Sequence, residues 1–206
     1  MNFKKERRGI VGIGKALYAR GFVVATDGNI SVRVGKNKFL ATPAGVCKGK
    51  LRAKDLIEVQ LGKVAKGVSS EIYMHFEIYA ARPDINAIVH AHSPFATAFA
   101  CAGRALSANL LPEALIRLRD VPLVEYAPPG SILLAKKVAS ALKKANCALM
   151  ANHGAVAVGR NLKEAFYNTE TLEHLARVSA IAKIAGKPKP LSKRSAGALK
   201  IISELL

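Results

Sequence analysis

The sequence has few cysteines, and their spacing excludes two kinds of stabilised fold. Its 206 residues include three, Cys47, Cys101 and Cys147, which lie far apart and form no Cys-x-x-Cys pair. Such a set gives neither a disulfide framework nor a thiolate zinc site, and it fits a reducing cytoplasm. Cys147 opens the apolar segment CALMA, so we expect it to be a small core residue.

Long apolar runs are also absent. Half of the residues are hydrophobic, yet no run approaches the roughly 18 residues that a membrane span needs. The basic N-terminus MNFKKERRGIVGIG is interrupted by glycine and charge, and no small-residue cleavage site follows it. We therefore expect a cytoplasmic protein without membrane partners, folded as one domain over residues 1–206.

Acidic residues are scarce: 14 of them face 32 lysines and arginines, which gives a net charge of +18. This charge is compatible with binding to nucleic acid, anionic membrane or anionic metabolites. The basic residues are spread through KKERR, KGKLRAK, KKVASALKK and KPKPLSKR without interleaved aromatic residues, and no nucleic-acid motif accompanies them. The pattern indicates a solvated basic surface and no specific nucleic-acid partner.

Periodicity and turn signals predict a mixed α/β chain without internal repeats. Helices are expected over about 4–20, from about 70 to the Arg82-Pro83 break, from about Pro94, after Gly130, and from about Leu162 to GKPKP. Strands are expected at ISVRV, KFLAT, IEVQL, INAIVHAH, VPLVEY, CALMA and AVAVG, and NLLPEA reads as a loop. The frequent hairpins favour a mixed sheet over a purely parallel one.

Three histidines stand at the ends of apolar strands. His90 and His92 end the strand INAIVHAH, and residues two apart in a strand point to the same face. A His-x-His pair alone is more often structural, but His153 in ANHGAV occupies the same setting beside a glycine. Three imidazoles with an open position match a catalytic zinc site. His75 and His174 fit helix faces better.

Carbonyl chemistry at a metal also needs a base, and Glu71 is the candidate. Its spacing alone fits an ordinary acid in the first turn of a helix, where the dipole favours it. The hydroxyls of Ser69 and Ser70 beside it form a possible anion cradle. Two glycine turns, TDGN at 26–29 and TPAG at 42–45, could add N–H donors, although most such turns are only turns.

Taken in order, DGNISVR, TPAG, SSEIYMH, IVHAHSPFATAFA, YAPPGS and NHGAVAVG resemble the landmarks of the class II aldolase and adducin head family. Within it, the sequence is most similar to the L-fuculose-1-phosphate aldolase branch, from about Gly12 to Leu191. The resemblance implies a three-layer α/β/α fold around a mixed, mostly antiparallel sheet. It also implies a homotetramer with active sites at subunit interfaces.

The resemblance further implies one zinc per chain, held by His90, His92 and His153, with Glu71 near or on the metal and acting as acid and base. The family's contacts to a substrate phosphate carry over to this list: Gly28, Asn29, Ala44, Gly45, Ser69 and Ser70. At Ala44 the family often has serine or threonine, so only the backbone N–H would remain there.

The implied reaction is the reversible cleavage of a ketose 1-phosphate to dihydroxyacetone phosphate and a short aldehyde such as lactaldehyde. The family pattern also includes a tyrosine from a neighbouring subunit, and NLLPEALIRL has none, with Leu111 nearest and Glu113 close. The aldehyde therefore stays open. Alternatives within the family are a methylthioribulose-type dehydratase, a ribulose-type 4-epimerase, which SSE with glutamate disfavours, and a decarboxylase. A non-catalytic adducin-like domain would have no use for an intact ligand set.

Overall fold

The computed structural model describes residues 2–205, and within them one seven-stranded sheet forms the middle layer. Its strands are β1 (Asn29–Gly35), β2 (Lys38–Ala41), β3 (Ile57–Gln60), β4 (Ala87–Ala91), β5 (Leu123–Val124), β6 (Cys147–Met150) and β7 (Gly154–Gly159). The order is β3-β2-β1-β4-β7-β6-β5, and every neighbouring pair is antiparallel except β5 with β6. The predicted mixed, mostly antiparallel sheet is confirmed.

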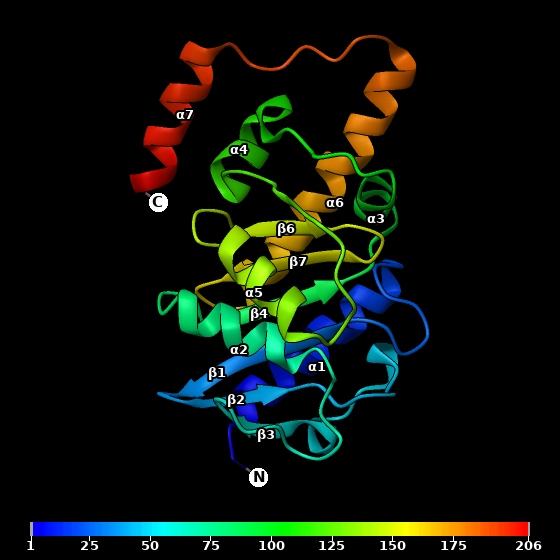
Figure 1. Ribbon diagram of the computed structural model, residues 1–206, viewed down its shortest axis with the longest axis vertical. Coiled ribbons are helices and arrows are strands. Elements are labelled where there is room, and N and C mark those ends of the chain that lie inside the picture. The colour runs from blue at the N-terminus through cyan, green and yellow to red at the C-terminus, as the bar shows by residue number, and fades with distance from the viewer. Residues whose placement is uncertain (1, 206) are drawn as a thin grey trace.

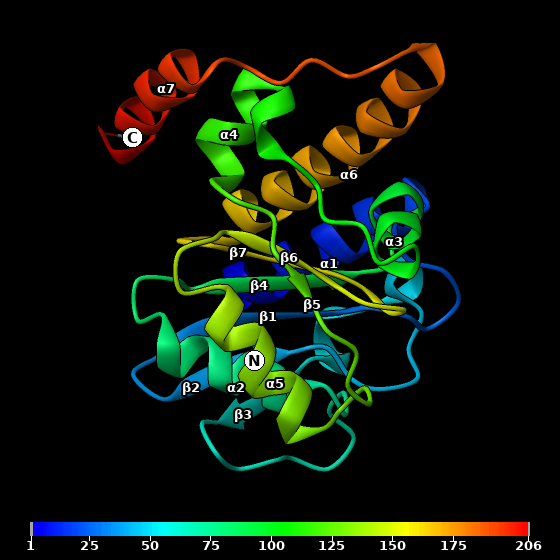
Figure 2. The ribbon, with the colours of Figure 1, turned by 45° about the horizontal axis from the view of Figure 1, so that its top comes forward.

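Helices cover both faces of the sheet. They are α1 (Lys4–Ala19), α2 (Ile72–Ala81), α3 (Pro94–Cys101), α4 (Pro112–Leu118), α5 (Ile132–Ala141), α6 (Leu162–Ala185) and α7 (Lys193–Leu205). Figure 2 shows α1, α3 and α6 on one side of the sheet and α2 with α5 on the other. An extended segment crosses from the end of α6 to α7, which packs beside α4 (Figure 1). The fold is therefore a three-layer α/β/α sandwich.

The alternation of side chains along β4 decides which layer each of them meets. Ile88 belongs to the core formed with α2 and α5, while Ala87, Val89 and Ala91 belong to the core on the α1 side. Since alternate residues share a face, His90 points with Ile88 toward α2. The strand therefore delivers an imidazole to the layer that contains the helix after Glu71.

The expected helices and strands are largely present, with four differences. The helix expected from about Ser70 begins at Ile72, and only two residues of VPLVEY pair as strand. The segment expected as a loop through NLLPEA contains a short 3-10 helix (Ala108–Leu110) and then α4, which begins at Pro112. A proline suits the first turn of a helix, so this Pro starts a helix and does not break one. The helix α7 was not anticipated.

Two further predictions concern the cysteines and the absence of a membrane span. The three cysteines are free, and Cys147 is fully buried in the core, as expected. Among the helices in residues 2–205, none combines the length and the apolar character that crossing a bilayer requires.

A buried carboxylate anchors the helix that follows the histidine strand. Glu173 on α6 is 1 % exposed, and its two carboxylate oxygens accept the backbone N–H groups of Phe95 and Ala96 at 3.0 and 2.9 Å. These amides belong to the first turn of α3, where free N–H groups and the helix dipole favour an anion. Glu173 thereby fixes the turn that leaves His92.

We expect Glu173→Ala to lower the free energy of unfolding by about 3 kcal/mol, because it leaves one buried and one partly buried N–H group without an acceptor. Urea denaturation of the two proteins measures this difference. The matched control is Glu170→Ala on the same helix, whose carboxylate pairs at the surface with Arg20 at 2.7 Å. That change should cost at most about 1 kcal/mol. Equal losses in both variants would contradict the capping role of Glu173.

Candidate metal centre and anion site

Two segments bring the three histidines together. His90 lies in β4, His92 follows the end of that strand, and His153 lies in the turn between β6 and β7. Because β4 and β7 are neighbours, the turn at the start of β7 stands beside the end of β4. The possible ligand atoms of the three side chains all lie within 4.8 Å of one another. The predicted convergence of His90, His92 and His153 is present in the structure.

Two glycines make room for this cluster. A Cβ on Gly154 would lie 2.7 Å from Cδ2 of His92 and 2.8 Å from the carbonyl oxygen of Ala91, closer than such atoms approach. Gly28 has a φ of +71°, and a Cβ there would lie 2.7 Å from the carbonyl oxygen of His90. The glycines of NHG and TDGN are therefore needed for the close approach of backbone to the histidines.

Glu71 lies against the histidines at the start of α2. Its Oε2 is 3.1 Å from Nε2 of His90, and its Oε1 is 3.2 Å from Nε2 of His153. Glu71 is the residue before the helix and is 9 % exposed, so it is not an acid of the first helical turn. The simpler interpretation of Glu71 as an ordinary acid in the first turn of the helix is wrong.

The protonation states favour an ionised carboxylate beside neutral His92 and His153, whereas the pKa of His90 is raised, because the charge and hydrogen bond of Glu71 outweigh the effect of burial. Burial acts to raise the pKa of Glu71, but the charge of His90 and hydrogen bonds from His90 and Asn29 outweigh it, so this pKa lies below its usual value. Burial, aided by His90, lowers the pKa of His153 to about 4 and also lowers the pKa of His92. Neutral imidazole is the form that ligates a metal.

The atoms at the centre of the cluster fit a cation. His90 donates its Nδ1–H to the carbonyl oxygen of Ala155 at 2.9 Å, which leaves Nε2 to face His92 Nε2 at 3.0 Å and Glu71 Oε2. Contacts this close need either a hydrogen on His90 Nε2 or a cation bound between the three atoms. Glu71 Oε1 is buried and has no hydrogen-bond partner within the described residues. Three imidazole nitrogens beside a carboxylate form a donor set suited to zinc.

Contacts also link two of the three segments expected to bind an anion. Pro43 of TPAG bridges Val68, just before Ser69 and Ser70, and the Ala44 N–H donates to the carbonyl oxygen of Gly67 at 2.9 Å. The expectation that the Ala44 N–H is available to a phosphate does not hold in this structure, because that donor is already used.

The other predicted phosphate donors in these turns differ in how far they are exposed to solvent. Gly45 has a φ of +67° with open space where a Cβ would be, and Ser70 is exposed. Ser69 is half-buried, and its Oγ accepts the N–H of Glu71 at 3.4 Å. Gly130 of YAPPGS packs on Ser70, with 3.6 Å between its Cβ position and the hydroxyl oxygen. Gly45 and Ser70 are thus the more accessible members of the predicted set.

The buried Lys48 side chain donates hydrogen bonds to two of these segments. The side chain is 1 % exposed, and Nζ donates to the carbonyl oxygens of Thr26 at 2.8 Å and Val46 at 2.9 Å. Burial lowers the pKa of Lys48 from its usual value. One ammonium group therefore positions both the TDGN turn and the segment after TPAG. The sequence showed Lys48 only as part of a basic stretch.

We expect Lys48→Met to raise the KM for a phosphorylated substrate about tenfold while metal content stays unchanged. The substitution keeps the length of the side chain and removes the donors to Thr26 and Val46, so both turns lose a hydrogen bond of roughly 1–2 kcal/mol. Steady-state kinetics and metal analysis measure the two effects. Lys50→Met, two residues away and exposed, is the control. An unchanged KM would remove Lys48 from the organisation of the anion site.

Three polar residues at the site were missed from the sequence. Asp27 of TDGN places Oδ2 3.5 Å from Nδ1 of His92, on the side of the ring away from the cluster. His75 and Ser31 form a buried chain with Asn29 that ends on Glu71. His75 does lie on a helix, as expected, but it faces the sheet, whereas His174 is exposed on α6.

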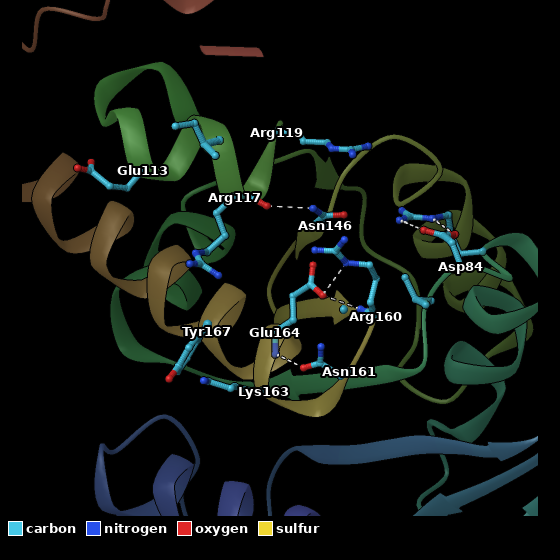
Figure 3. A pocket seen from close by; sticks show the side chains of 14 residues that line it. Asp84, Glu113, Arg117, Arg119, Asn146, Arg160, Asn161, Lys163, Glu164 and Tyr167 are labelled. Atoms are coloured by element: carbon cyan, nitrogen blue, oxygen red, sulfur yellow. Dashed lines mark hydrogen bonds and ion pairs between the residues drawn. The ribbon is translucent and has the colours of Figure 1, made fainter. Parts of the chain in front are cut away.

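A pocket lies at the opposite end of the same strands (Figure 3). It includes Gly159 at the end of β7, whereas His153 precedes β7, and a strand of this length spans roughly 20 Å. Glu113 lines this pocket with Arg117 and Arg119, so within one chain it is remote from the histidines. Arg82 pairs with Asp84 and Arg160 with Glu164 around the opening. The pocket contains no counterpart of the histidine and carboxylate cluster.

The fold and the cluster together define an α/β/α chain that can hold a cation beside a buried carboxylate. Residues 8–180 match the family Class II Aldolase and Adducin N-terminal domain, and the chain belongs to this family. It is 39 % identical over 167 residues to L-fuculose phosphate aldolase of Methanococcus maripaludis strain C7, covering 80 % of this chain and 91 % of that protein.

Other relatives carry a different activity. A 3-oxo-tetronate 4-phosphate decarboxylase of Pectobacterium atrosepticum is 34 % identical over 182 residues, covering 85 % of this chain and 84 % of that protein. Among solved structures, an L-fuculose 1-phosphate aldolase superposes with a TM-score of 0.91 at 32 % identity, covering 99 % of this chain and 98 % of the other. The family is metal-dependent, and the chain is a lyase-family enzyme by this relationship.

Proposed function

We propose that this protein is a zinc-dependent aldolase, which reversibly cleaves a ketose 1-phosphate to dihydroxyacetone phosphate and a short aldehyde. The observation that carries the proposal is the buried Glu71 carboxylate in contact with two of three converging imidazoles. The likeness to L-fuculose phosphate aldolases over most of the chain supports this reaction class. Its three free thiols fit the reducing conditions of a cytoplasm.

The chain's residues divide the chemistry between them. His90, His92 and His153 would hold one zinc ion, and Glu71 would lie on or beside it. Such a cation, when bound, supplies Lewis acidity that polarises a ketone and stabilises the charge of an enediolate. In the condensation direction, Glu71 removes a proton from the carbon of dihydroxyacetone phosphate that bears the free hydroxyl. In the cleavage direction it returns the proton to the same carbon.

A phosphate-binding role for the linked turns fits this reaction. We assign it to Gly28, Gly45, Ser69 and Ser70, together with the backbone of Asn29, whose side chain is already engaged with Glu71. Ala44 contributes shape, since its N–H is used within the fold. Binding the phosphate away from the reacting carbon would orient that carbon toward Glu71 without taking part in the chemistry.

The second candidate is a decarboxylase, and the relatives of that name favour it. Loss of CO2 from a 3-oxo-tetronate 4-phosphate breaks the bond between the carboxylate carbon and its neighbour. The electron pair left behind forms the enediolate of dihydroxyacetone phosphate, which then takes up one proton. Both reactions share this enediolate, so one set of phosphate turns, metal ligands and carboxylate serves either.

A direct comparison of substrates tests the proposed function. Zinc-loaded protein is incubated with dihydroxyacetone phosphate and a panel of short aldehydes that includes lactaldehyde, and separately with 3-oxo-tetronate 4-phosphate. We expect formation of a ketose 1-phosphate from the first mixture, and no activity after chelation. Release of CO2 without any condensation would identify the protein as a decarboxylase. No product in either assay would overturn the lyase proposal.

We also propose a homotetramer with active sites at subunit interfaces. The region matched to the family's tyrosine holds Leu111 and Glu113, and Glu113 lies at the far pocket of its own chain. A group from this region could therefore reach a reaction centre only in another subunit. Light scattering measures the mass in solution, and a monomer that condenses aldehydes would contradict this arrangement.

A further inference from the structure

A chain of buried hydrogen bonds runs from the sheet to the back of Glu71. The distances are 2.9 Å from Tyr79 OH to Ser31 Oγ, 2.6 Å from Ser31 Oγ to His75 Nδ1, and 2.6 Å from His75 Nε2 to Asn29 Oδ1. The last link is 2.8 Å from Asn29 Nδ2 to Glu71 Oε2. Tyr79, Ser31, His75 and Asn29 are each at most 4 % exposed, so water does not compete for these bonds.

The carboxylate end fixes the direction of the chain. An ionised carboxylate only accepts hydrogen bonds, so the Asn29 amide must present its NH2 to Glu71 and its oxygen to His75. That oxygen only accepts, so Nε2 of His75 must carry a hydrogen. Burial, aided by the nearby His90, lowers the pKa of His75 to about 3, and a neutral imidazole has one hydrogen.

The remaining two links follow from that tautomer. Nδ1 of His75 has only a lone pair, so the Ser31 hydroxyl donates to it. The single hydrogen of Ser31 is then used, and the Tyr79 hydroxyl donates to Ser31. Burial raises the pKa of Tyr79, so this hydroxyl keeps its proton. Each donor and acceptor in the chain has one assignment.

We infer that His75 is a positioning residue for the proposed reaction, which acts in its neutral Nε2–H tautomer through Asn29 on Glu71. With the other tautomer, the Asn29 amide would either face a lone pair with its oxygen or turn that oxygen toward the carboxylate. Both arrangements bring acceptors together. The chain therefore holds Oε2 and leaves Oε1 of Glu71 outside it.

The tautomer can be observed without any activity. In zinc-loaded protein labelled with 15N-histidine, long-range proton–nitrogen correlation spectra distinguish a protonated from an unprotonated ring nitrogen. We expect His75 to show a protonated Nε2 and an unprotonated Nδ1, with the signal assigned by its loss in His75→Gln. Ser31→Ala removes the donor to Nδ1 but leaves the Asn29 oxygen facing Nε2, so it should keep the same tautomer. A wild-type His75 protonated on Nδ1, or on both nitrogens, overturns the inference.

Activity adds a second readout, which rests on the proposed function. His75→Leu removes the donor to Asn29 and should lower kcat about ten- to a hundredfold, with zinc content and KM little changed. His75→Gln should recover much of the loss, because the Gln amide can donate near the position of Nε2. His174→Leu is the control, because His174 is exposed on α6 and takes no part in the chain of hydrogen bonds. Equal kcat in His75→Leu and wild type overturns the inference.

The outcomes separate the two proposals. If wild-type protein shows the expected tautomer but no reaction with dihydroxyacetone phosphate, the proposed function fails and the hydrogen-bond chain stands. If it reacts but His75 carries the proton on Nδ1, the function stands and the chain is wrongly assigned. Should His75→Leu fail to fold, the spectrum of the wild type alone decides.

Discussion

Replacing Glu71 by glutamine is expected to slow hydrogen exchange into dihydroxyacetone phosphate by roughly 10²–10⁴-fold, the usual contribution of a general base. The amide keeps the shape of the side chain but cannot accept the proton. Exchange requires no aldehyde, so the test is independent of the second substrate. Zinc-loaded protein in deuterated water is followed by NMR or mass spectrometry, and wild type should exchange one hydrogen on the hydroxyl-bearing carbon.

Two controls keep this result specific. Glu77→Gln is the same change on the helix that follows Glu71, at a half-buried position outside the cluster, and it should leave the exchange rate unchanged. Chelated wild type should not exchange, and the zinc content of Glu71→Gln must be measured because the carboxylate lies within contact distance of two possible ligands. Exchange that survives Glu71→Gln at full zinc content would show that another group is the base.

The histidine cluster was predictable from sequence because its signals are local. Two imidazoles at alternate positions of one strand must share a face, and the glycine after His153 marks a sharp turn at a strand end. What local pattern did not give was the pairing of β4 with β7, which brings His153 to the other two. That step came from the order of motifs that resemble a known family.

Glu71 shows where local reasoning stops. Its spacing fits a helix-dipole acid equally well, and only its contact with His90 decides between the two. The polar chain behind it is harder still, because Asn29 and His75 are 46 residues apart and meet through the packing of α2 on β1. A histidine at helical spacing gives no sign that it faces a serine and an amide.

Removing one imidazole is expected to have the largest effect on the metal. Wild type should bind about one zinc per chain, and His92→Ala should weaken binding by more than about a hundredfold. Loss of a residue that only orients a metal ligand typically lowers metal affinity 10- to 100-fold, so loss of a ligand itself should lower it by more. Competition with a chromophoric chelator and elemental analysis measure both quantities.

Replacing Asp27 shows how much zinc affinity is lost when a group that only orients a ligand is removed. Its carboxylate lies 3.5 Å from Nδ1 of His92, so Asp27→Asn keeps all three imidazoles and weakens only the group that orients one of them. Its loss should fall within about 10- to 100-fold, and His174→Ala, at an exposed position on α6, should change nothing. Native protein that binds no zinc tightly would remove the metal centre. A loss in Asp27→Asn as large as that in His92→Ala would instead make Asp27 a ligand, since an orienting group cannot matter as much as the nitrogen it orients.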